Sequence, residues 1–255
     1  TNQLAHYLLT MKIGRGCRVG IQLPRSSALL IAVLGVMKSG ASYVALDPAL
    51  PRSRLDYLIT DAQIDLVLAD SKLMTAASLS AYSDSQPDVV ISAQSIAYLL
   101  YTSGSTGLPK GVVITHSGLA NYLSHAARHY FTDSTTRSIV SSPLSFDATI
   151  TTLLTPLLLG RCVEILPESD DILSALAAAL THHIPTLFKL TPAHLTGLQY
   201  LINTPIKTPH VLVIGGEQLS RPLLRSSQTL LPNATFINEY GPTETVVGCV
   251  VHELL

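Results

Sequence analysis

Charged residues are scarce in this sequence, and tryptophan is absent. Asp, Glu, Lys and Arg make up 13% of the 255 residues and leave a net charge of −1, whereas about 25% is usual for soluble domains. The basic residues are scattered rather than arranged in stripes, so no nucleic-acid partner is expected. The longest apolar run covers residues 28–37, well short of the roughly 20 residues that span a bilayer. We therefore expect a large buried core and no membrane partner.

Cysteine is also rare. Cys17, Cys162 and Cys249 are far apart and lie in or beside apolar runs. An odd, dispersed set of this kind predicts buried free thiols in a reducing compartment, and no signal peptide is visible at the N-terminus. We therefore expect a cytoplasmic protein. The chain starts without methionine and stops inside an apolar run, so we expect it to be a piece of a longer protein.

Apolar, strand-like runs alternate with helix-like segments along most of the chain. This alternation predicts βαβ units, and therefore an α/β fold with largely parallel sheet flanked by helices. The expected strands cover residues 18–23, 42–46, 65–69, 138–142, 162–166, 186–190, 210–214 and 235–238. The expected helices cover residues 27–39, 51–61, 117–130, 149–159, 171–182, 193–202 and 221–230. A polar stretch at 132–137 predicts two lobes, residues 1–133 and 134–255.

One loop between two apolar runs is rich in glycine and hydroxyl groups. Residues 101–111 read YTSGSTGLPKG. Glycines let a backbone come close to a ligand, and N–H groups, hydroxyls and a lysine suit an anion such as a triphosphate. The alternative is a plain glycine-serine loop that only joins two strands. Because no Gly-Lys-Ser/Thr sequence is present, the loop is not a Walker A motif.

These eleven residues closely resemble the phosphate loop of adenylate-forming enzymes, which include acyl-CoA synthetases, luciferases and the adenylation domains of nonribosomal peptide synthetases. Residues 37–55 (MKSGASYVALDPALPRSRL) resemble the adenylation domains in particular. The resemblance implies the N-terminal core of such an enzyme, in two lobes and without its C-terminal lid, and binding of ATP and Mg²⁺. It implies catalytic roles for Thr102, Ser103, Thr106 and Lys110, and nucleotide contacts for Gly104, Ser105 and Gly107.

A second motif, residues 238–244 (NEYGPTE), follows the last expected strand. A tyrosine ring on a tight turn can stack on a base, which contributes about 1–3 kcal/mol, and a glutamate is a hard oxygen ligand for Mg²⁺. The alternative is a surface turn with an incidental tyrosine. The motif resembles its counterpart in adenylation domains. This implies that Asn238, Tyr240 and Gly241 bind the nucleotide, that Thr243 lies near the α-phosphate and that Glu244 binds Mg²⁺. It also implies that Gly215, Gly216 and Glu217 form the opposite wall of the nucleotide site, where side chains in place of the glycines would collide with the ligand.

Asp147 belongs to a third motif, SFDA at residues 145–148. It could simply cap the helix that begins nearby. The resemblance implies instead that it binds the α-ammonium group of an amino acid, which ligases of fatty acids do not need. Ligands of open parallel sheets bind at the carboxyl ends of strands. We therefore expect the phosphate loop, the SFDA motif, residues 215–217 and residues 238–244 to line one cleft.

The resemblance also places the positions of the amino-acid pocket, which are Asp147, Ala148, Thr151, Lys189, Val213, Gly215, Glu239, Val247 and Gly248. Lys189 lies inside an apolar strand, where a charge is costly unless it is paired or faces a ligand; the alternative is an outward-facing lysine on an edge strand. A donor at Lys189 and an acceptor at Glu239 suit a primary amide, whereas two carboxylates 4 Å apart repel by about 4 kcal/mol at an effective dielectric of 20. We expect asparagine or a β-substituted asparagine, with aspartate second because a protonated Glu239 would remove the repulsion.

The expected reaction is activation of this amino acid by ATP to aminoacyl-AMP and pyrophosphate. The resemblance implies that a peptidyl carrier protein then receives the aminoacyl group, alongside neighbouring synthetase domains. Because the family's later motifs are absent, we expect residues 1–255 alone to be inactive or nearly so. Two other functions stay open: a ligase of a carboxylate that is not an amino acid, related to acyl-CoA synthetases, and a non-catalytic nucleotide-binding fragment.

Overall fold

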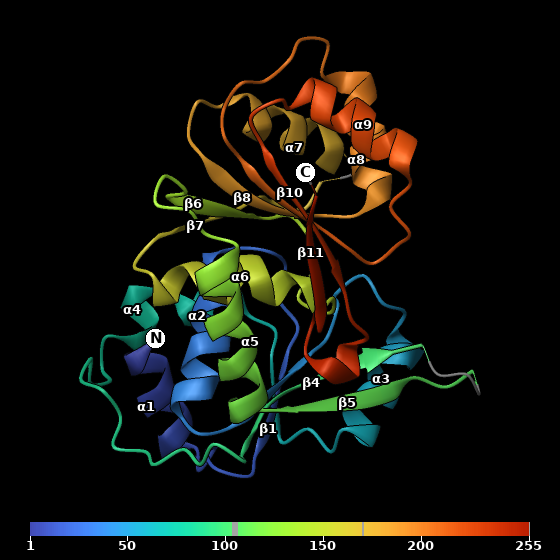
Figure 1. Ribbon diagram of the computed structural model, residues 1–255. Coiled ribbons are helices and arrows are strands. Elements are labelled where there is room, and N and C mark those ends of the chain that lie inside the picture. The colour runs from blue at the N-terminus through green and yellow to red at the C-terminus, as the bar shows by residue number, and fades with distance from the viewer. Residues whose placement is uncertain (104–106, 170, 255) are drawn as a thin grey trace. The chain divides into compact units, whose positions relative to one another are not determined.

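The computed structural model describes residues 1–103, 107–169 and 171–254 (Figure 1). The chain divides into two compact units. Unit 1 comprises Thr1–Ala120 and Pro143–Phe146, and unit 2 comprises Asn121–Ser142 and Asp147–Leu255. Each unit has one sheet of mostly parallel strands, so the predicted α/β class is confirmed.

The sheet of unit 1 has the strand order β3-β1-β2-β4-β5. Strands β1 to β4 run parallel, and β5 returns antiparallel to β4. Parallel neighbours need crossover connections, which the helices between these strands supply. The strands are β1 (Arg18–Ile21), β2 (Ser42–Ala45), β3 (Leu66–Leu68), β4 (Ile96–Thr102) and β5 (Lys110–Thr115).

Helices cover the sheet of unit 1. They are α1 (Asn2–Thr10), α2 (Ser27–Lys38), α3 (Arg52–Asp61), the short 3-10 helix η1 (Ser71–Met74) and α4 (Ala76–Leu79). Helix α3 buries Leu55 in a cluster with Val44 and Leu99 of the sheet. Because side chains alternate along a strand, Tyr43 and Tyr98 lie on the opposite face, where their rings stack 5.4 Å apart.

The sheet of unit 2 has the strand order β11-β10-β9-β8-β6-β7, and only β11 pairs antiparallel with its neighbour. Its strands are β6 (Arg137–Val140), β7 (Cys162–Ile165), β8 (Thr186–Leu190), β9 (Val211–Ile214), β10 (Thr235–Tyr240) and β11 (Val250–Leu254). The remaining helices are α5 (His116–His129), which begins in unit 1, α6 (Ala148–Leu158), α7 (Ile172–Thr181), α8 (Pro192–Leu201), α9 (Arg221–Leu230) and the 3-10 helix η2 (Thr243–Thr245).

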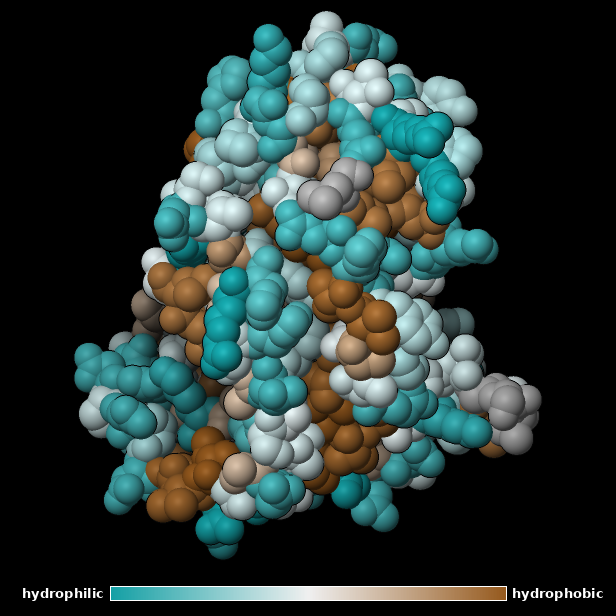
Figure 2. Space-filling model, in the orientation of Figure 1, coloured by the Kyte–Doolittle hydropathy of each residue, from teal (hydrophilic) through white to brown (hydrophobic). Residues whose placement is uncertain are grey.

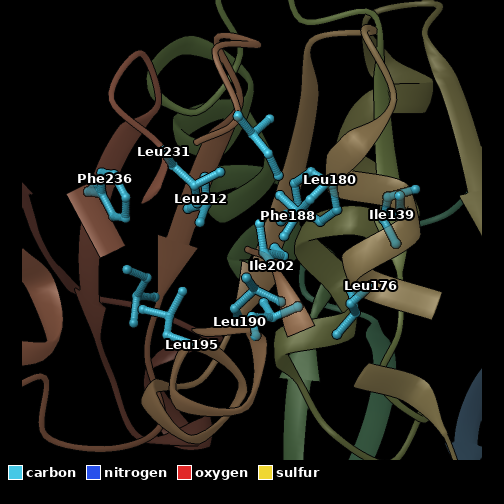
Figure 3. Close-up of a cluster of buried hydrophobic side chains, with 14 of the residues drawn as sticks. Ile139, Leu176, Leu180, Phe188, Leu190, Leu195, Ile202, Leu212, Leu231 and Phe236 are labelled. Carbon is cyan, nitrogen blue, oxygen red and sulfur yellow. The ribbon is translucent and has the colours of Figure 1, made fainter. Parts of the chain in front are cut away.

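One apolar core fixes the central strands of unit 2. Phe188 and Leu190 of β8 pack with Leu212 of β9, Phe236 of β10 and leucines of the helices, including Leu180 (Figure 3). Each such side chain contributes about 1.5–3 kcal/mol when fully buried. Alternation along the strands turns the residues between them, on β8 and β10, to the other face of the sheet. That other face carries the candidate site.

The structure adds elements that the sequence reasoning did not identify. Helix α1 was not predicted, and the serine- and alanine-rich region before β4 contains η1 and α4. The apolar run at the end of the chain forms β11, which pairs with β10. The other expected elements are present, and their ends differ from the expected ones by at most two residues.

The division into units differs from the boundary expected after residue 133. The segment Asn121–Ser142 belongs to unit 2, because Tyr122 and Tyr130 hydrogen-bond to Thr151 and Glu239 of that unit. Residues 1–133 and 134–255 stay a prediction as functional lobes.

The expectation of buried thiols was wrong. Cys162 and Cys249 are exposed and Cys17 is partly exposed, although all three are free. Cys162 starts the edge strand β7, and Cys249 precedes the edge strand β11. Edge positions leave one side of a strand open, so an apolar sequence context did not lead to burial.

The surface is mixed in polarity. Figure 2 shows brown apolar areas between teal hydrophilic side chains on the face that it presents. Large apolar side chains that are exposed include Leu158, Tyr200, Tyr240 and Val250. Among the described residues, none of the helices combines the length and apolar character that crossing a membrane requires.

Candidate functional site

A buried ion pair lies at the centre of the candidate pocket in unit 2. Strand β8 has neighbours on both sides, and its Lys189 contacts the carboxylate of Glu239 on β10. The side chains are only 7% and 2% exposed. The alternative of an outward-facing lysine on an edge strand was therefore wrong. The register pairs Lys189 with Val213, which is fully buried on β9.

Hydroxyl groups complete the surroundings of Glu239. Its Oε1 accepts hydrogen bonds from Tyr130 at 2.5 Å and from Tyr122 at 3.1 Å, while its Oε2 accepts from Lys189. The Tyr122 hydroxyl also lies 2.6 Å from the hydroxyl of Thr151 on α6. A carboxylate has room for about four donors. Among the described residues, two donors contact Oε1 and one contacts Oε2.

Glycines leave room for this cluster. A Cβ at Gly248 would lie 2.3 Å from the carboxyl carbon of Glu239, and a Cβ at Gly215 would lie 2.6 Å from the backbone oxygen of Glu239. A side chain at Gly215 would therefore collide with the protein itself, and a collision with the ligand stays a prediction. Gly216 has a φ of +84°, which side chains rarely adopt.

The segment before Gly248 is strained. Val246 and Val247 both have a φ of 64°, which is a genuine outlier for a β-branched residue. Val247, a position predicted for the pocket, is only 5% exposed and is held in this unfavourable backbone conformation. Such strain is concentrated at ligand-binding sites.

Asp147 comes immediately before α6 but does not act as its usual cap. Within the described chain, its side chain makes no capping hydrogen bond to the helix interior. The carboxylate instead accepts hydrogen bonds from the Thr243 hydroxyl and from the N–H of Ala148, its immediate neighbour. A helix cap as the only role of Asp147 is thus excluded by the geometry.

Burial shifts the pKa values of two interacting charged groups, Asp147 and Lys189. It raises the pKa of Asp147, against the lowering effect of the Thr243 hydrogen bond and of Lys189. Burial lowers the pKa of Lys189 to about 7, and the Asp147 carboxylate opposes this shift. The two groups interact electrostatically, and each favours the charged form of the other.

The motif at 238–244 forms the end of β10 and the turn into η2. Tyr240 is 67% exposed, and the acidic side chain of Glu244 lies in an exposed 3-10 turn. A Cβ at Gly241 would lie 2.7 Å from the Cα of Gly248, so only glycine lets these two segments touch. Asn238 is partly buried in β10, opposite Ile214.

Glu217 has a structural contact. Its carboxylate accepts a hydrogen bond of 3.2 Å from the N–H of Ala193, in the first turn of α8. A negative charge is favourable at a helix N-terminus. The contact links the end of β9 to the start of α8, and nucleotide binding by Glu217 stays a prediction.

The phosphate loop belongs to unit 1, where it joins β4 to β5. Thr102 pairs with Lys110 across the hairpin. The hydroxyl of Tyr101 donates a 2.7 Å hydrogen bond to Asp61, which anchors the start of the loop. Gly104, Ser105 and Thr106 lie outside the described residues. Of the others, Ser103 and Gly107 are exposed, and Gly107 has a φ of +87°.

The structure therefore brings together the pocket residues of unit 2. The residues joined by printed contacts or close approach are Asp147, Ala148, Thr151, Lys189, Val213, Gly215, Glu239, Thr243 and Gly248. The phosphate loop is part of the other unit. That all four motifs line one cleft stays a prediction.

Comparison with known proteins identifies the family. The family described as "AMP-binding enzyme" matches residues 1–254. The chain belongs to the AMP-binding enzyme family. It is 33% identical to Bacitracin synthase 3 of Bacillus licheniformis over 99% of the chain and 4% of that protein. It is 34% identical to Malpinin synthetase of Mortierella alpina over 97% of the chain and 3% of that protein.

Solved structures extend the comparison. A four-domain nonribosomal peptide synthetase, holo-AB3403 bound to AMP and glycine, matches 99% of the chain with a TM-score of 0.84 and 29% identity, over 20% of its own length. The nonribosomal peptide synthetase FmoA3 matches with a TM-score of 0.89 and 24% identity over 99% of the chain and 29% of its own length, which shows the shared fold. The resemblance to adenylation domains is confirmed. The chain spans only a few per cent of the curated relatives that it matches.

The residues of this AMP-binding enzyme fit the nucleotide and the metal that the family implies. Tyr240 presents an exposed ring, which is available for stacking on a base. Among the described residues, no group of three or more His, Cys, Asp or Glu could hold a metal alone. A single exposed carboxylate, as at Glu244, is typical of Mg²⁺ held mainly by water and phosphates.

The sequence reasoning missed Tyr122 and Tyr130. Both lie on the buried side of α5 and its end, together with Leu123 and Ala126. This spacing of four buried positions over nine residues is helical. A buried tyrosine hydroxyl usually has a hydrogen-bond partner, so the pattern could have indicated a polar contact but not which residue supplies it.

Proposed function

We propose that this protein activates an amino acid by adenylation, with asparagine as the preferred substrate and aspartate second. One oxygen of the substrate carboxylate attacks the α-phosphorus of ATP. The new bond is the acyl phosphate of aminoacyl-AMP, and the bond to the bridging oxygen breaks, so pyrophosphate leaves with the electron pair. No protein nucleophile is needed, because the reaction depends on positioning and on stabilisation of charge.

The position of Asp147 is the observation that carries this proposal. A carboxylate that is not used as a helix cap, and that lies near Lys189 in the pocket, is suited to bind the α-ammonium group of an amino acid. A fatty acid offers no cation to compensate it. The relatives that match the chain include a structure bound to AMP and glycine, which supports an amino acid as the substrate class.

The preference for asparagine follows from the charges of the pocket. Lys189 and Glu239 neutralise each other, and Asp147 would be neutralised by the substrate ammonium group. The side-chain oxygen of asparagine can accept from Lys189, and its NH₂ group can donate to the remaining place on Oε2 of Glu239. The carboxylate of aspartate would add an uncompensated negative charge beside Glu239, which is costly in a buried site.

We assign nucleotide contacts to the phosphate loop and to the NEYGPTE motif. Thr102, Ser103, Thr106 and Lys110 would stabilise the phosphates, and Tyr240 would stack on adenine. When bound at Glu244, Mg²⁺ supplies positive charge to the phosphate oxygens. The aminoacyl group is then transferred to a carrier-protein phosphopantetheine thiol: the thiol loses its proton, a thioester forms and AMP leaves.

Pyrophosphate exchange with the full-length protein tests this function. Each common amino acid is supplied separately, and asparagine is expected to give the largest signal. Asp147→Asn should lower kcat/KM for the amino acid by about 100-fold, because hydrogen bonds between charged groups contribute about 1.5–3 kcal/mol.

Asp171→Asn is the matched control. Asp171 caps α7 through Ser174, and asparagine caps a helix about as well as aspartate, so activity should not change. Exchange that is unaffected by Asp147→Asn would contradict the assignment of the ammonium site. A strong signal with other amino acids and none with asparagine would contradict the specificity.

A further inference from the structure

Two tyrosines outside the predicted pocket hold its acidic residue in place. Tyr130 is fully buried and Tyr122 is 3% exposed, and both donate to the same oxygen of Glu239. Neither residue belongs to the strands that carry Lys189 and Glu239. They come from α5 and its C-terminal end, more than 100 residues earlier in the chain.

We propose that Tyr122 and Tyr130 are positioning residues that keep the Glu239 carboxylate ionised and aligned, and thereby make the pocket select a neutral side chain over a carboxylate. This inference rests on the proposed function, because it names what enforces the preference for asparagine over aspartate.

The first argument concerns ionisation. Hydrogen bonds to a carboxylate favour its charged form, and Glu239 receives three donors in a site where it is only 4% exposed. Aspartate could be accepted if Glu239 took up a proton, since this would remove the repulsion between carboxylates. The two hydroxyls oppose that protonation. Discrimination against aspartate therefore depends on them.

The second argument concerns geometry. Tyr122 and Tyr130 donate to Oε1, so the other oxygen, Oε2, is the one that contacts Lys189 and can contact the ligand. Tyr122 is itself held by Thr151 of α6 at 2.6 Å. Gly248 lies against the carboxyl carbon of Glu239 on another side. The carboxylate therefore has little freedom to turn.

Other ionisable groups near the cluster do not duplicate this role. His125 on α5 packs edge-on against Tyr130 with ring centroids 5.7 Å apart. Burial lowers the pKa of His125, which disfavours a cationic ring beside the tyrosine. Lys189 and Asp147 face the pocket from β8 and from the start of α6. Among the described residues, the hydrogen bonds to Oε1 come from the two tyrosine hydroxyls.

The test measures kcat/KM for asparagine and for aspartate by pyrophosphate exchange in the full-length protein. Tyr122→Phe and Tyr130→Phe are each expected to reduce the asparagine-to-aspartate ratio by about tenfold, because each removes a hydrogen bond to a charged group. The change should come mainly from a lower KM for aspartate, with kcat for asparagine little altered. An equal loss for both substrates, with the ratio unchanged, would mean a purely structural role and would overturn the inference.

Tyr43→Phe is the matched control. Tyr43 is equally buried, in unit 1, and its hydroxyl has no hydrogen-bond partner among the described residues. The ratio should not change in this variant.

Tyr130→Phe made in the Glu239→Gln variant distinguishes a positioning role of Tyr130 from a role in folding. In Glu239→Gln, the residue at 239 cannot ionise, so adding Tyr130→Phe should leave the ratio where Glu239→Gln alone puts it. A further fall of the ratio would contradict the inference. This comparison also holds if Tyr130→Phe lowers the amount of folded protein, because a ratio of two substrates does not depend on enzyme concentration.

The proposed function and this inference fail in different ways. If the wild-type protein does not activate asparagine, the proposed specificity is wrong. The tyrosines are then tested with the best substrate that has a neutral side chain and the best that has a carboxylate. The ratio of their kcat/KM values must fall in both phenylalanine variants. If the wild type prefers asparagine and the ratio is unchanged by both variants, only the inference is wrong.

Discussion

Lys189 cannot be removed from the pocket without leaving a charge behind. Its partner Glu239 is 2% exposed at the side chain, and breaking a buried ion pair by removing one member costs about 3–5 kcal/mol. Replacing both members by uncharged residues of similar size is far less costly. The pair is therefore a functional feature more than a source of stability.

A double-mutant cycle checks this at the residue scale. Lys189→Met should lower the stability of the protein by about 3–5 kcal/mol, seen as a lower denaturation midpoint. Lys189→Met combined with Glu239→Gln should regain most of the loss, although both proteins should have lost amino-acid selectivity. A double variant no more stable than Lys189→Met would show that the ion pair itself is stabilising.

Individual residues also explain where sequence reasoning succeeded in the site. Lys189 in an apolar strand and Glu239 in the NEYGPTE motif stood out because charge in such places needs a reason. Tyr122 and Tyr130 did not stand out, because tyrosines on a buried helix face are common. Their hydroxyls acquire a role only when α5 lies against β10.

At the scale of elements, the end of β8 and the start of α8 are joined by a tight cap. The Thr191 hydroxyl accepts from the N–H of His194, and the His194 ring accepts from the N–H of Thr191, which forms a capping box. Pro192 occupies the first turn, where its missing N–H has no cost. This cap fixes the path of the backbone after β8, the strand that carries Lys189.

Thr191→Ala should therefore lower the free energy of unfolding by about 1 kcal/mol, the usual cost of losing a helix cap. Thr191→Ser keeps the hydroxyl and is the control, with stability close to that of the wild type. Denaturation of the two variants under the same conditions makes the comparison. Equal losses in both would show that the methyl group of Thr191, rather than the cap, is responsible.

Helices and strands were predicted well where hydrophobic periodicity coincides with capping residues. An example is α2, where the Ser26 side chain accepts a hydrogen bond from the N–H of Leu29. Strand β11 was not predicted as a partner of β10 because pairing is a long-range property. Register also came only from the structure. It places Lys189 beside Val213 and turns both away from the apolar core.

At the scale of the whole molecule, the two units carry different parts of the proposed reaction. The phosphate loop is in unit 1, and the amino-acid pocket and the NEYGPTE motif are in unit 2. Substitutions in the two units should therefore have separable effects.

Lys110→Met should reduce pyrophosphate exchange strongly, by about 100-fold, because it removes a charge-assisted contact to phosphate. The ratio of kcat/KM between two amino acids should stay unchanged, whereas Lys189→Met should change that ratio. Lys72→Met, an exposed lysine on η1 in unit 1, is the control and should change neither quantity. A changed amino-acid ratio in Lys110→Met would contradict the separation.

The sequence alone determined the α/β class, the order of most elements and the family, since these depend on local periodicity and on contiguous motifs such as YTSGSTGLPKG. It also determined which polar residues were unusual. Only the tertiary structure decided that the Asp147 side chain hydrogen-bonds to Thr243, that Lys189 and Glu239 pair with each other, and that two tyrosines donate to the Glu239 carboxylate. Those facts depend on burial and on contacts between residues distant in the chain, which no local pattern specifies.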